Sequence, residues 1–230
     1  MVPFATHPEM TWNWSDDEDV KLVCEQIKNL VNAHAVRLTT HPGQYSVLNS
    51  PNEDIVKRCI EDFEYHAKLM DLMGGTDMIT HVGGVYGDKE AAKARWVENY
   101  LKLPNSVKDK LRLENDDKSF HIHDVLEISA KCGLPVVLDI HHHNCCNDPN
   151  MGKISDILDM IMGTWGNRVP KMHISTGKTG RTDRSHHDYI SEEDFNELLE
   201  LLGDRNVDIM FEAKKKEESI VRVGKLALNR

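Results

Sequence analysis

The sequence lacks the features that would place the protein in a membrane. No apolar run approaches the roughly 20 residues that a membrane-spanning helix needs, and no signal peptide precedes the start at Pro3 and Phe4. Hydrophobic residues make up 40% of the chain and charged residues 29%, which is ordinary for a soluble globular protein. We therefore expect a cytoplasmic protein that does not bind a membrane.

A disulfide framework and a zinc knuckle are also missing. The five cysteines, which include the adjacent Cys145 and Cys146, show no pairing pattern, so we expect reduced thiols. The run His141–His143 before these cysteines resembles a compact zinc knuckle. It contains no Cys-x-x-Cys, however, and its spacing suits no closed structural zinc site.

The chain has no excess of positive charge, since its net charge is −10. Taken alone, this value argues against a nucleic-acid partner. Bound metal ions can supply a local positive field, and a site built from carboxylates makes the metal-free chain look more acidic. The charge therefore makes a DNA partner less expected without excluding it.

Low-complexity segments and short repeats are absent, and helix-like and strand-like segments alternate instead. The six segments predicted as strands are Val36–Thr39, Asp77–His81, Leu111–Glu114, Pro135–Ile140, Val169–Ile174 and Val207–Glu212. The predicted helices are one capped by Ser15–Asp17 with apolar residues from Val20 to Val31, one from residues 50–52 to Met73, Asp88–Leu103, His123–Lys131, Ile154–Met162, Glu192–Leu202 and one at the C-terminus. This alternation implies parallel strand pairing and an α/β architecture.

Six strands leave two arrangements open. A closed TIM (β/α)8-type barrel needs eight strands, so the chain forms either an open sheet or a barrel without its first two strands. We favour the second arrangement, because the chain begins with a helix and no strand ahead of it. Residues Met1–Met10 are then the tail of a lost strand and its loop, and residues 1–230 form one barrel domain.

Metal-ligand residue types stand at the end of every predicted strand. They are His41, His81, Glu114, Asp139 with His141–His143 behind it, Lys171 with His173, and Glu212. A single histidine there is ordinarily a loop residue, and a single acid often caps the next helix. Chance does not place such a residue at six successive strand ends, where barrel enzymes carry their chemistry. Mixed histidine and carboxylate ligands suit hydrolytic Zn²⁺ or Mn²⁺.

Lys171 is unusual among these residues. It stands two positions before His173, so strand alternation puts both side chains on one face. Beside bound cations, Lys171 is expected to act as a neutral amine or to carry a carbamate that makes it an anionic ligand. The alternative is a lysine that leans out toward a phosphate.

Several motifs together resemble those of the UV-damage endonucleases, relatives of endonuclease IV among the TIM-barrel hydrolases. In order they are Thr40-His-Pro-Gly-Gln-Tyr45 with Leu48–Pro51, His81-Val-Gly-Gly84 with Tyr86-Gly-Asp-Lys89, Leu113-Glu-Asn-Asp-Asp117, Asp139-Ile-His-His142, Lys171-Met-His-Ile-Ser175, His186–Tyr189 and Phe211-Glu-Ala-Lys214. The match extends over essentially the whole chain. The sequence departs from the family at its N-terminus. The family's first strand and helix, and most of its second strand, have no counterpart in this sequence.

The resemblance implies a DNA repair endonuclease that nicks damaged double-stranded DNA 5′ of UV photoproducts and other distorting lesions. It implies up to three divalent ions, usually Mn²⁺, with Zn²⁺ or Co²⁺ as alternatives. The implied metal ligands are His41, His81, Glu114, Asp139, His142, His173, His186 and Glu212. Lys171 matches the family's carboxylated lysine, and His7 matches a further active-site histidine. Gln44 and Tyr45 match the pair that wedges into the duplex, although Tyr45 alternatively packs under its own loop.

For the chemistry, we expect Glu114 to bridge metals while the ions and Lys171 neutralise charge on the phosphate. Lys178, Arg181 and Arg184, in the loop before His186, either grip the DNA backbone or form a solvated polar loop. Other hypotheses are an abasic-site endonuclease, a sugar isomerase of the same barrel type, and an inactive damage-binding or metal-binding fragment. We expect a monomer.

Overall fold

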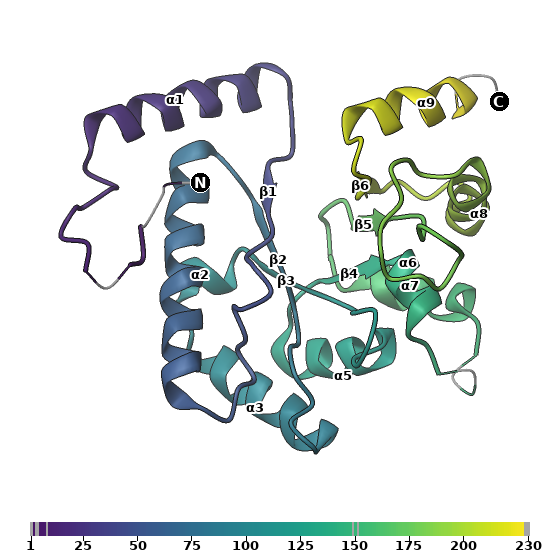
Figure 1. The fold of residues 1–230 in the computed structure, drawn as a ribbon, viewed down its shortest axis with the longest axis horizontal. Helices are drawn as coiled ribbons and strands as arrows, with labels where there is room; N and C mark the ends of the chain where they lie inside the picture. The colour runs from purple at the N-terminus through teal and green to yellow at the C-terminus, as the bar shows by residue number, and fades with distance from the viewer. Residues whose placement is uncertain (1, 3–4, 8, 149, 151, 228–230) are drawn as a thin grey trace. The chain divides into compact units, whose positions relative to one another are not determined.

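The chain forms two compact units, residues 1–112 and 113–230, and the boundary between them falls inside a strand (Figure 1). The computed structural model describes every residue except 1, 3–4, 8, 149, 151 and 228–230. Within this described part, no helix combines the length and the apolar character needed to cross a membrane. The single domain expected over residues 1–230 stays a prediction.

Unit 1 contains four helices and two complete strands among its described residues, and it ends within a third strand. Its elements are α1 (Glu18–Ala33), β1 (Thr39–Thr40), α2 (Glu53–Met73), β2 (Asp77–His81), α3 (Lys89–Lys102), α4 (Asn105–Lys108) and the start of β3 (Leu111–Glu114). The short helix α4 was not expected from the sequence.

Short polar side chains start the long helices of unit 1. The Asp17 carboxylate accepts the amides of Asp19 and Val20 at the start of α1, two residues later than Ser15. Asn52 caps α2 in the same way, and Gly74, at φ 75°, ends that helix in the left-handed conformation. Helix α1 lies against α2 (Figure 1).

Strands β1 and β2 of unit 1 pair in parallel. Thr39 of β1 lies opposite Asp77 of β2. The Met78 amide donates to the Lys110 carbonyl at 2.7 Å, which places β2 beside the start of β3. Met78 and Ile79 of β2 are buried, and so is Trp96 of α3.

Unit 2 repeats the alternation of strand and helix. After the end of β3 its elements are α5 (Ile122–Cys132), β4 (Val136–Asp139), α6 (Ile140–Cys145), α7 (Ile154–Gly163), β5 (Lys171–Ile174), α8 (Glu192–Leu202), β6 (Asp208–Phe211) and α9 (Glu217–Ala227). Strands β3 to β6 are hydrogen-bonded in chain order, and each adjacent pair is parallel.

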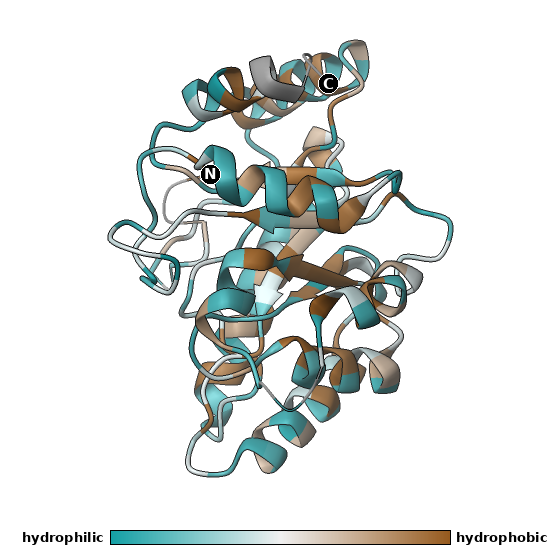
Figure 2. Ribbon diagram, turned by 90° about the vertical axis from the view of Figure 1, so that its right-hand side faces the viewer, coloured by the Kyte–Doolittle hydropathy of each residue, from teal (hydrophilic) through white to brown (hydrophobic). Residues whose placement is uncertain are grey.

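The core of unit 2 is built from fully buried strands and from the helices beside them. Every residue of β3, β4 and β5 is buried, and α5, α6 and α7 lie against β4 or β5 (Figure 1). The buried Trp165 indole N–H donates to the Val136 carbonyl at 2.7 Å. Figure 2 shows hydrophobic residues along strands, whereas the helices carry both hydrophobic and hydrophilic residues.

The predicted α/β class and the six strands are confirmed for the residues that the structure describes. The strand predicted over Pro135–Ile140 is shorter in the structure and ends at Asp139. Asp139 directly caps the short helix α6, whose first residue is Ile140, and its carboxylate accepts the His142 amide at 2.7 Å.

Candidate metal centre

Four side chains from successive strand ends of unit 2 meet at one point. Glu114 ends β3, Asp139 ends β4, His173 lies in β5 and Glu212 follows β6. Each offers one donor atom, and these four atoms lie within 4.8 Å of one another. The register explains the convergence, because Asp139 is opposite His173 and the Glu212 amide donates to the Ile174 carbonyl at 2.9 Å.

This cluster concentrates negative charge in a buried place. The His173 Nδ1 atom lies 2.7 Å from the Glu114 carboxylate and 3.0 Å from the Glu212 carboxylate. Burial lowers the pKa of His173, but the two glutamates outweigh it and raise that pKa to about 10. Burial, together with Glu114 and Glu212, raises the pKa of Asp139.

These observations fit a bound cation. Asp139 Oδ2 is buried and accepts no hydrogen bond within the described part of the chain, although a buried carboxylate oxygen ordinarily has a partner. Three carboxylates around one imidazole leave an excess of negative charge that a divalent ion balances. Oxygen and imidazole donors together suit Mn²⁺, Zn²⁺ or Co²⁺.

His142 is held beside this cluster by a residue that sequence reasoning missed. The Asn115 side chain donates to the Asp139 carbonyl at 3.0 Å and accepts the Asp139 amide at 2.9 Å. The Asn115 carbonyl lies 3.0 Å from His142 Nδ1. A carbonyl can only accept, so Nδ1 carries the proton and Nε2 keeps its lone pair for a metal. The position of Asn115 directly after a strand-end glutamate was its only sequence signal.

His186 reaches the same neighbourhood from the loop between β5 and α8. Its ring centroid lies 6.4 Å from that of His142, and its Nδ1 lies 4.0 Å from the Glu212 carboxylate. A bridge between Gly177 and His186 closes the loop. A Cβ at Gly177 would lie 2.0 Å from the Gly180 carbonyl oxygen, so the loop needs glycine there.

Lys171 and His173 occupy one face of β5, as strand alternation predicts. Lys171 is only 4% exposed and His173 2%. Both the carbamate on Lys171 and the alternative in which this lysine leans out toward a phosphate stay predictions.

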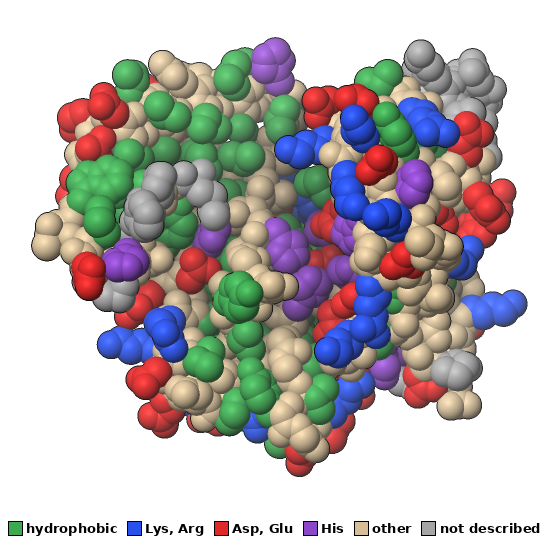
Figure 3. Space-filling model, viewed as in Figure 1, with side chains coloured by type: hydrophobic (Ala, Val, Ile, Leu, Met, Phe, Trp, Pro, Cys, Tyr) green, Lys and Arg blue, Asp and Glu red, His purple; other side chains and the backbone are tan. Residues whose placement is uncertain are grey.

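The three basic residues predicted to grip DNA are exposed, but two of them already have acidic partners. Arg181 lies 2.6 Å from the Glu197 carboxylate, and Arg184 lies 3.6 Å from that of Asp117. For Lys178, an exposed residue, the structure gives no ion-pair partner among the described residues. Figure 3 shows Lys and Arg side chains gathered over β5, β6 and the neighbouring loop, beside histidine and acidic side chains.

Unit 1 brings the other two strand-end histidines together. The ring centroids of His41 and His81 are 5.1 Å apart. His41 Nδ1 lies 3.0 Å from the Pro42 carbonyl, so it carries a proton and leaves Nε2 with a lone pair. Gly83, two residues after His81, has φ 110°, and a Cβ there would lie 2.5 Å from Asn49 Oδ1. Any larger side chain at position 83 would clash with Asn49, which explains the first glycine of the motif His81-Val-Gly-Gly84.

The loop after β1 presents Gln44 and Tyr45 to solvent. Tyr45 is 85% exposed, so the alternative in which it packs under its own loop is wrong. A hydrogen bond to α2 anchors this loop, because the Ser46 hydroxyl donates to the Asp62 carboxylate on that helix. His66 Nε2 lies 3.7 Å from the same carboxylate, and His66 Nδ1 lies 3.2 Å from the Thr40 hydroxyl. Sequence reasoning missed Asp62 and His66, which are polar residues within an otherwise ordinary helix pattern.

His7 is exposed and borders a hollow of about 360 Å³ with Trp14, Tyr65 and Lys68. Its Nδ1 accepts the Glu9 amide at 3.3 Å. These contacts give His7 a place in unit 1 without assigning it a chemical role.

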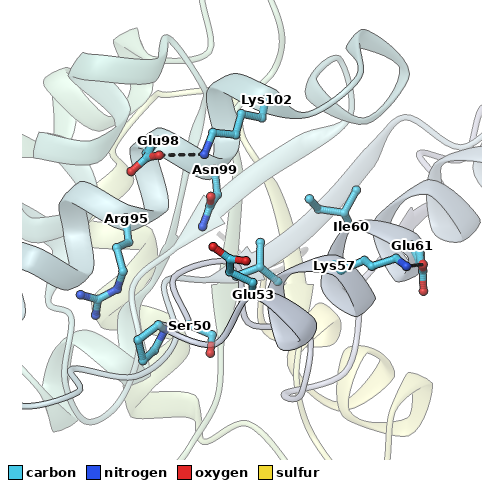
Figure 4. A pocket seen from close by; sticks show the side chains of 11 residues that line it. Ser50, Glu53, Lys57, Ile60, Glu61, Arg95, Glu98, Asn99 and Lys102 are labelled. Atoms are coloured by element: carbon cyan, nitrogen blue, oxygen red, sulfur yellow. Dashed lines mark hydrogen bonds and ion pairs between the residues drawn. The ribbon is translucent and has the colours of Figure 1, made fainter.

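A second hollow of about 450 Å³ lies between α2 and α3 (Figure 4). Its charged side chains are partly paired, as in Glu98 with Lys102 at 2.7 Å and Lys57 with Glu61 at 4.0 Å. None of the residues predicted for the site lines it. This hollow therefore adds nothing to the candidate centre.

Comparison with known proteins shows similarity along the whole chain. Residues 1–229 match the family model described as UV-endonuclease UvdE. The chain is 34% identical to the UV DNA damage endonuclease of Clostridium perfringens over 96% of its own length and 55% of the relative. It is 35% identical to the UV DNA damage endonuclease of Bacillus pumilus over 97% of its own length and 71% of the relative.

Solved structures show the same relationship. The crystal structure of SacUVDE superimposes with a TM-score of 0.87 at 34% identity, covering 97% of this chain and 77% of that one. Endonuclease IV from Thermus thermophilus gives a TM-score of 0.63 at 19% identity, over 90% of this chain and 81% of that chain. A 3-keto-D-glucoside 4-epimerase from E. coli gives 0.65 at 12% identity, over 90% and 86%. The last two likenesses concern the fold alone.

Proposed function

The chain belongs to the UV-endonuclease UvdE family, and we propose that it is a metal-dependent DNA repair endonuclease. In this proposal it nicks double-stranded DNA on the 5′ side of UV photoproducts and other distorting lesions. The observation that carries the proposal is the buried group of Glu114, Asp139, His173 and Glu212, whose donor atoms lie within 4.8 Å of one another. The chain spans 55% of the Clostridium perfringens relative and 71% of the Bacillus pumilus relative.

In the proposed site, the four clustered residues together with His142 and His186 would hold divalent ions. Bound ions of this kind activate water and neutralise charge that develops on a phosphate. Mn²⁺ is our first choice, with Zn²⁺ and Co²⁺ as alternatives, because histidine and carboxylate ligands are mixed. His41 and His81, which lie together in unit 1, stay predicted ligands.

The residues of the chain have separate tasks in this mechanism. Glu114 and Asp139 are buried acceptors that fix the position of cations, and Asn115 fixes Asp139 and His142. Lys171, buried on the same strand face as His173, acts as a neutral amine or, once carboxylated, as a further anionic ligand. His7 stays a predicted participant.

Exposure of Gln44 and Tyr45 supports a DNA duplex as the substrate. A sugar isomerase would need an enclosed apolar pocket, whereas an exposed ring on a supported loop can enter a base stack. Distorted sites yield most readily, because extruding a poorly stacked nucleotide costs least. An abasic-site endonuclease is the second candidate, since it too acts on a distorted duplex.

The substrate proposal is tested with three duplexes that carry a photoproduct, an abasic site or no lesion. With Mn²⁺, we expect the photoproduct duplex to be nicked fastest and Tyr45→Ala to slow that reaction by roughly 5- to 100-fold, as expected for one lost base–aromatic stack. The Tyr45→Ala protein should keep its bound metal. Trp12→Ala, which removes a 38% exposed ring elsewhere in unit 1, is the matched control. Faster nicking of the abasic duplex would favour the second candidate.

Lys178 is the basic loop residue best placed to meet a phosphate, because Arg181 and Arg184 pair with Glu197 and Asp117. We expect Lys178→Ala to weaken binding to all DNA sequences alike and to reduce the slope of log K against log salt by about 1. Fluorescence anisotropy at several salt concentrations measures both effects. A slope equal to that of the wild type would show that Lys178 contacts no phosphate.

We also propose that the six strands are part of a (β/α)8 barrel, which has eight. The SacUVDE comparison, which covers 77% of that chain, supports this reading. The protein is proposed to act as a monomer in the cytoplasm.

A further inference from the structure

The turn between β2 and α3 carries a tyrosine in an unusual backbone conformation. The Asp88 amide donates to the Val85 carbonyl at 3.2 Å, which closes a four-residue turn over residues 85–88. The two central residues, Tyr86 and Gly87, have φ angles of 53° and 82°. Positive φ at both central positions is the pattern of a type I′ turn, in which asparagine, aspartate and glycine dominate. A bulky tyrosine is therefore unfavourable for the backbone at position 86.

Burial does not account for this tyrosine. Tyr86 is 48% exposed, so much of its ring faces solvent. Its hydroxyl forms no hydrogen bond to any other residue that the structure describes. A strained residue of this kind persists only where its surroundings determine its conformation, and such residues cluster at functional sites. The strain and the exposure together point to a ligand for the ring.

Two neighbours hold the Tyr86 ring in place. A Cβ at Gly84 would lie 2.9 Å from the Cε2 and Cζ atoms of the ring, so any side chain at position 84 would displace it. The Arg95 guanidinium lies over the ring, 5.6 Å from its centroid, and Arg95 projects from α3 (Figure 4). The ring is therefore fixed on one part of its surface and open on the rest.

Asn49 fixes both of these neighbours. Its side-chain Nδ2 donates to the Gly84 carbonyl at 2.8 Å, and its own carbonyl accepts a hydrogen bond from Arg95 Nε at 3.0 Å. Asn49 is fully buried, so these two contacts are shielded from water. The support of the Tyr86 ring is thus built into the fold of unit 1.

The Tyr86 turn lies beside the loop that presents Tyr45. A Cβ at Gly83 would lie 2.6 Å from Val47 Cγ1, so the loops after β1 and β2 are in contact. The two loops leave the same edge of the sheet, because β1 and β2 are parallel neighbours. Each loop carries one exposed aromatic ring, Tyr45 on the first and Tyr86 on the second.

We propose that Tyr86 is a second stacking platform, which binds a base that a lesion leaves unpaired in the DNA. This inference rests on the proposed function, because it takes damaged DNA as the substrate. An open tyrosine ring stacks on any base, whatever the sequence, since every base has a π face. A poorly stacked base near a lesion costs least to expose. Tyr86 therefore strengthens binding to damaged DNA more than binding to intact DNA.

The variant Tyr86→Asn separates this role from a structural one. Asparagine suits a positive φ, so the variant should unfold at the same temperature as the wild type or at a higher one. Its binding to a photoproduct duplex should nevertheless weaken by roughly 5- to 100-fold, as expected for one lost base–aromatic stack. Binding to an intact duplex of the same sequence should change less than about twofold, since its bases stay stacked. Fluorescence anisotropy measures both affinities, and thermal unfolding measures stability.

Two further variants serve as controls. Tyr86→Phe keeps the ring and should bind both duplexes like the wild type. Trp12→Ala removes a 38% exposed ring elsewhere in unit 1 and should also leave both affinities unchanged. A loss in Tyr86→Phe as large as that in Tyr86→Asn would overturn the inference, because the hydroxyl and not the ring face would then contact the DNA.

The wild type distinguishes failure of this inference from failure of the proposed function. If the wild type prefers the photoproduct duplex and Tyr86→Asn keeps that preference, Tyr86 is no stacking platform. A lower unfolding temperature with an unchanged preference would show that the ring serves the fold alone. If the wild type binds the photoproduct and intact duplexes equally, the proposed function itself is refuted, and the inference with it.

Discussion

Replacing Glu114 with glutamine is expected to reduce nicking of UV-irradiated plasmid with Mn²⁺ by on the order of 10³-fold, or about 4 kcal/mol of transition-state stabilisation. Glu114 is fully buried, and its carboxylate lies 2.7 Å from His173 Nδ1. Glutamine has almost the same size but no charge, so the change removes an anionic donor and leaves the packing nearly intact. The bound metal should fall by at least one equivalent.

The matched control is Glu98→Gln on α3, which removes a carboxylate that is 68% exposed and pairs with Lys102. It should leave both nicking and metal content unchanged. If Glu114→Gln nicked within about threefold of the wild type and kept its metal, the proposed mechanism would be wrong. Metal loss remains informative even if the wild-type chain nicks slowly, because it reports on the site without requiring turnover.

The largest expected loss of stability comes from Asp77 at the start of β2. Its carboxylate lies 2.6 Å from Arg112 Nε and 2.8 Å from Arg37 Nε, and the Asp77 and Arg112 side chains are each only 2% exposed. Asp77→Ala removes a buried carboxylate that pairs with the buried Arg112, and breaking such a pair costs roughly 3–5 kcal/mol. Urea unfolding of the full chain should show this loss as a lower midpoint.

A surface pair in the same unit provides the comparison. Asp71 lies 2.6 Å from Lys110 but is 58% exposed, so Asp71→Ala should cost about 1 kcal/mol or less. Similar losses for the two variants would show that burial does not set the strength of the Asp77 pairs.

The Asp77 contribution should depend on pH in one direction. Burial raises the pKa of Asp77, but Arg37 and Arg112 outweigh it and hold that pKa below its ordinary value of 3.8. A lowered folded-state pKa means that the stabilisation is complete above pH 3.8 and disappears as the pH falls through the lower value. The difference between wild type and Asp77→Ala should therefore be constant near neutrality and shrink only in acid.

Local sequence patterns predicted most of the secondary structure. Asp77–His81, Leu111–Glu114 and Glu192–Leu202 have the predicted bounds, because short runs rich in apolar residues and serine or glycine boundaries act over a few residues. The pattern was less informative about burial. Val23 and Leu30 of α1 are 52% and 60% exposed despite their helical spacing, since spacing defines an apolar face but not what covers it.

By itself, the sequence determined that ligand residue types end the strands, and parallel strands put such residues at one edge. Only the tertiary structure decided which donors meet: Glu114, Asp139, His173 and Glu212 share one point because the register of β3 to β6 brings their ends together. It also decided that Asn115 orients His142 and that Arg181 pairs with Glu197. These contacts join residues 16 to 98 positions apart, so no local spacing encodes them. The residue types therefore predicted a candidate metal centre, and the geometry of that candidate centre depends on strand register.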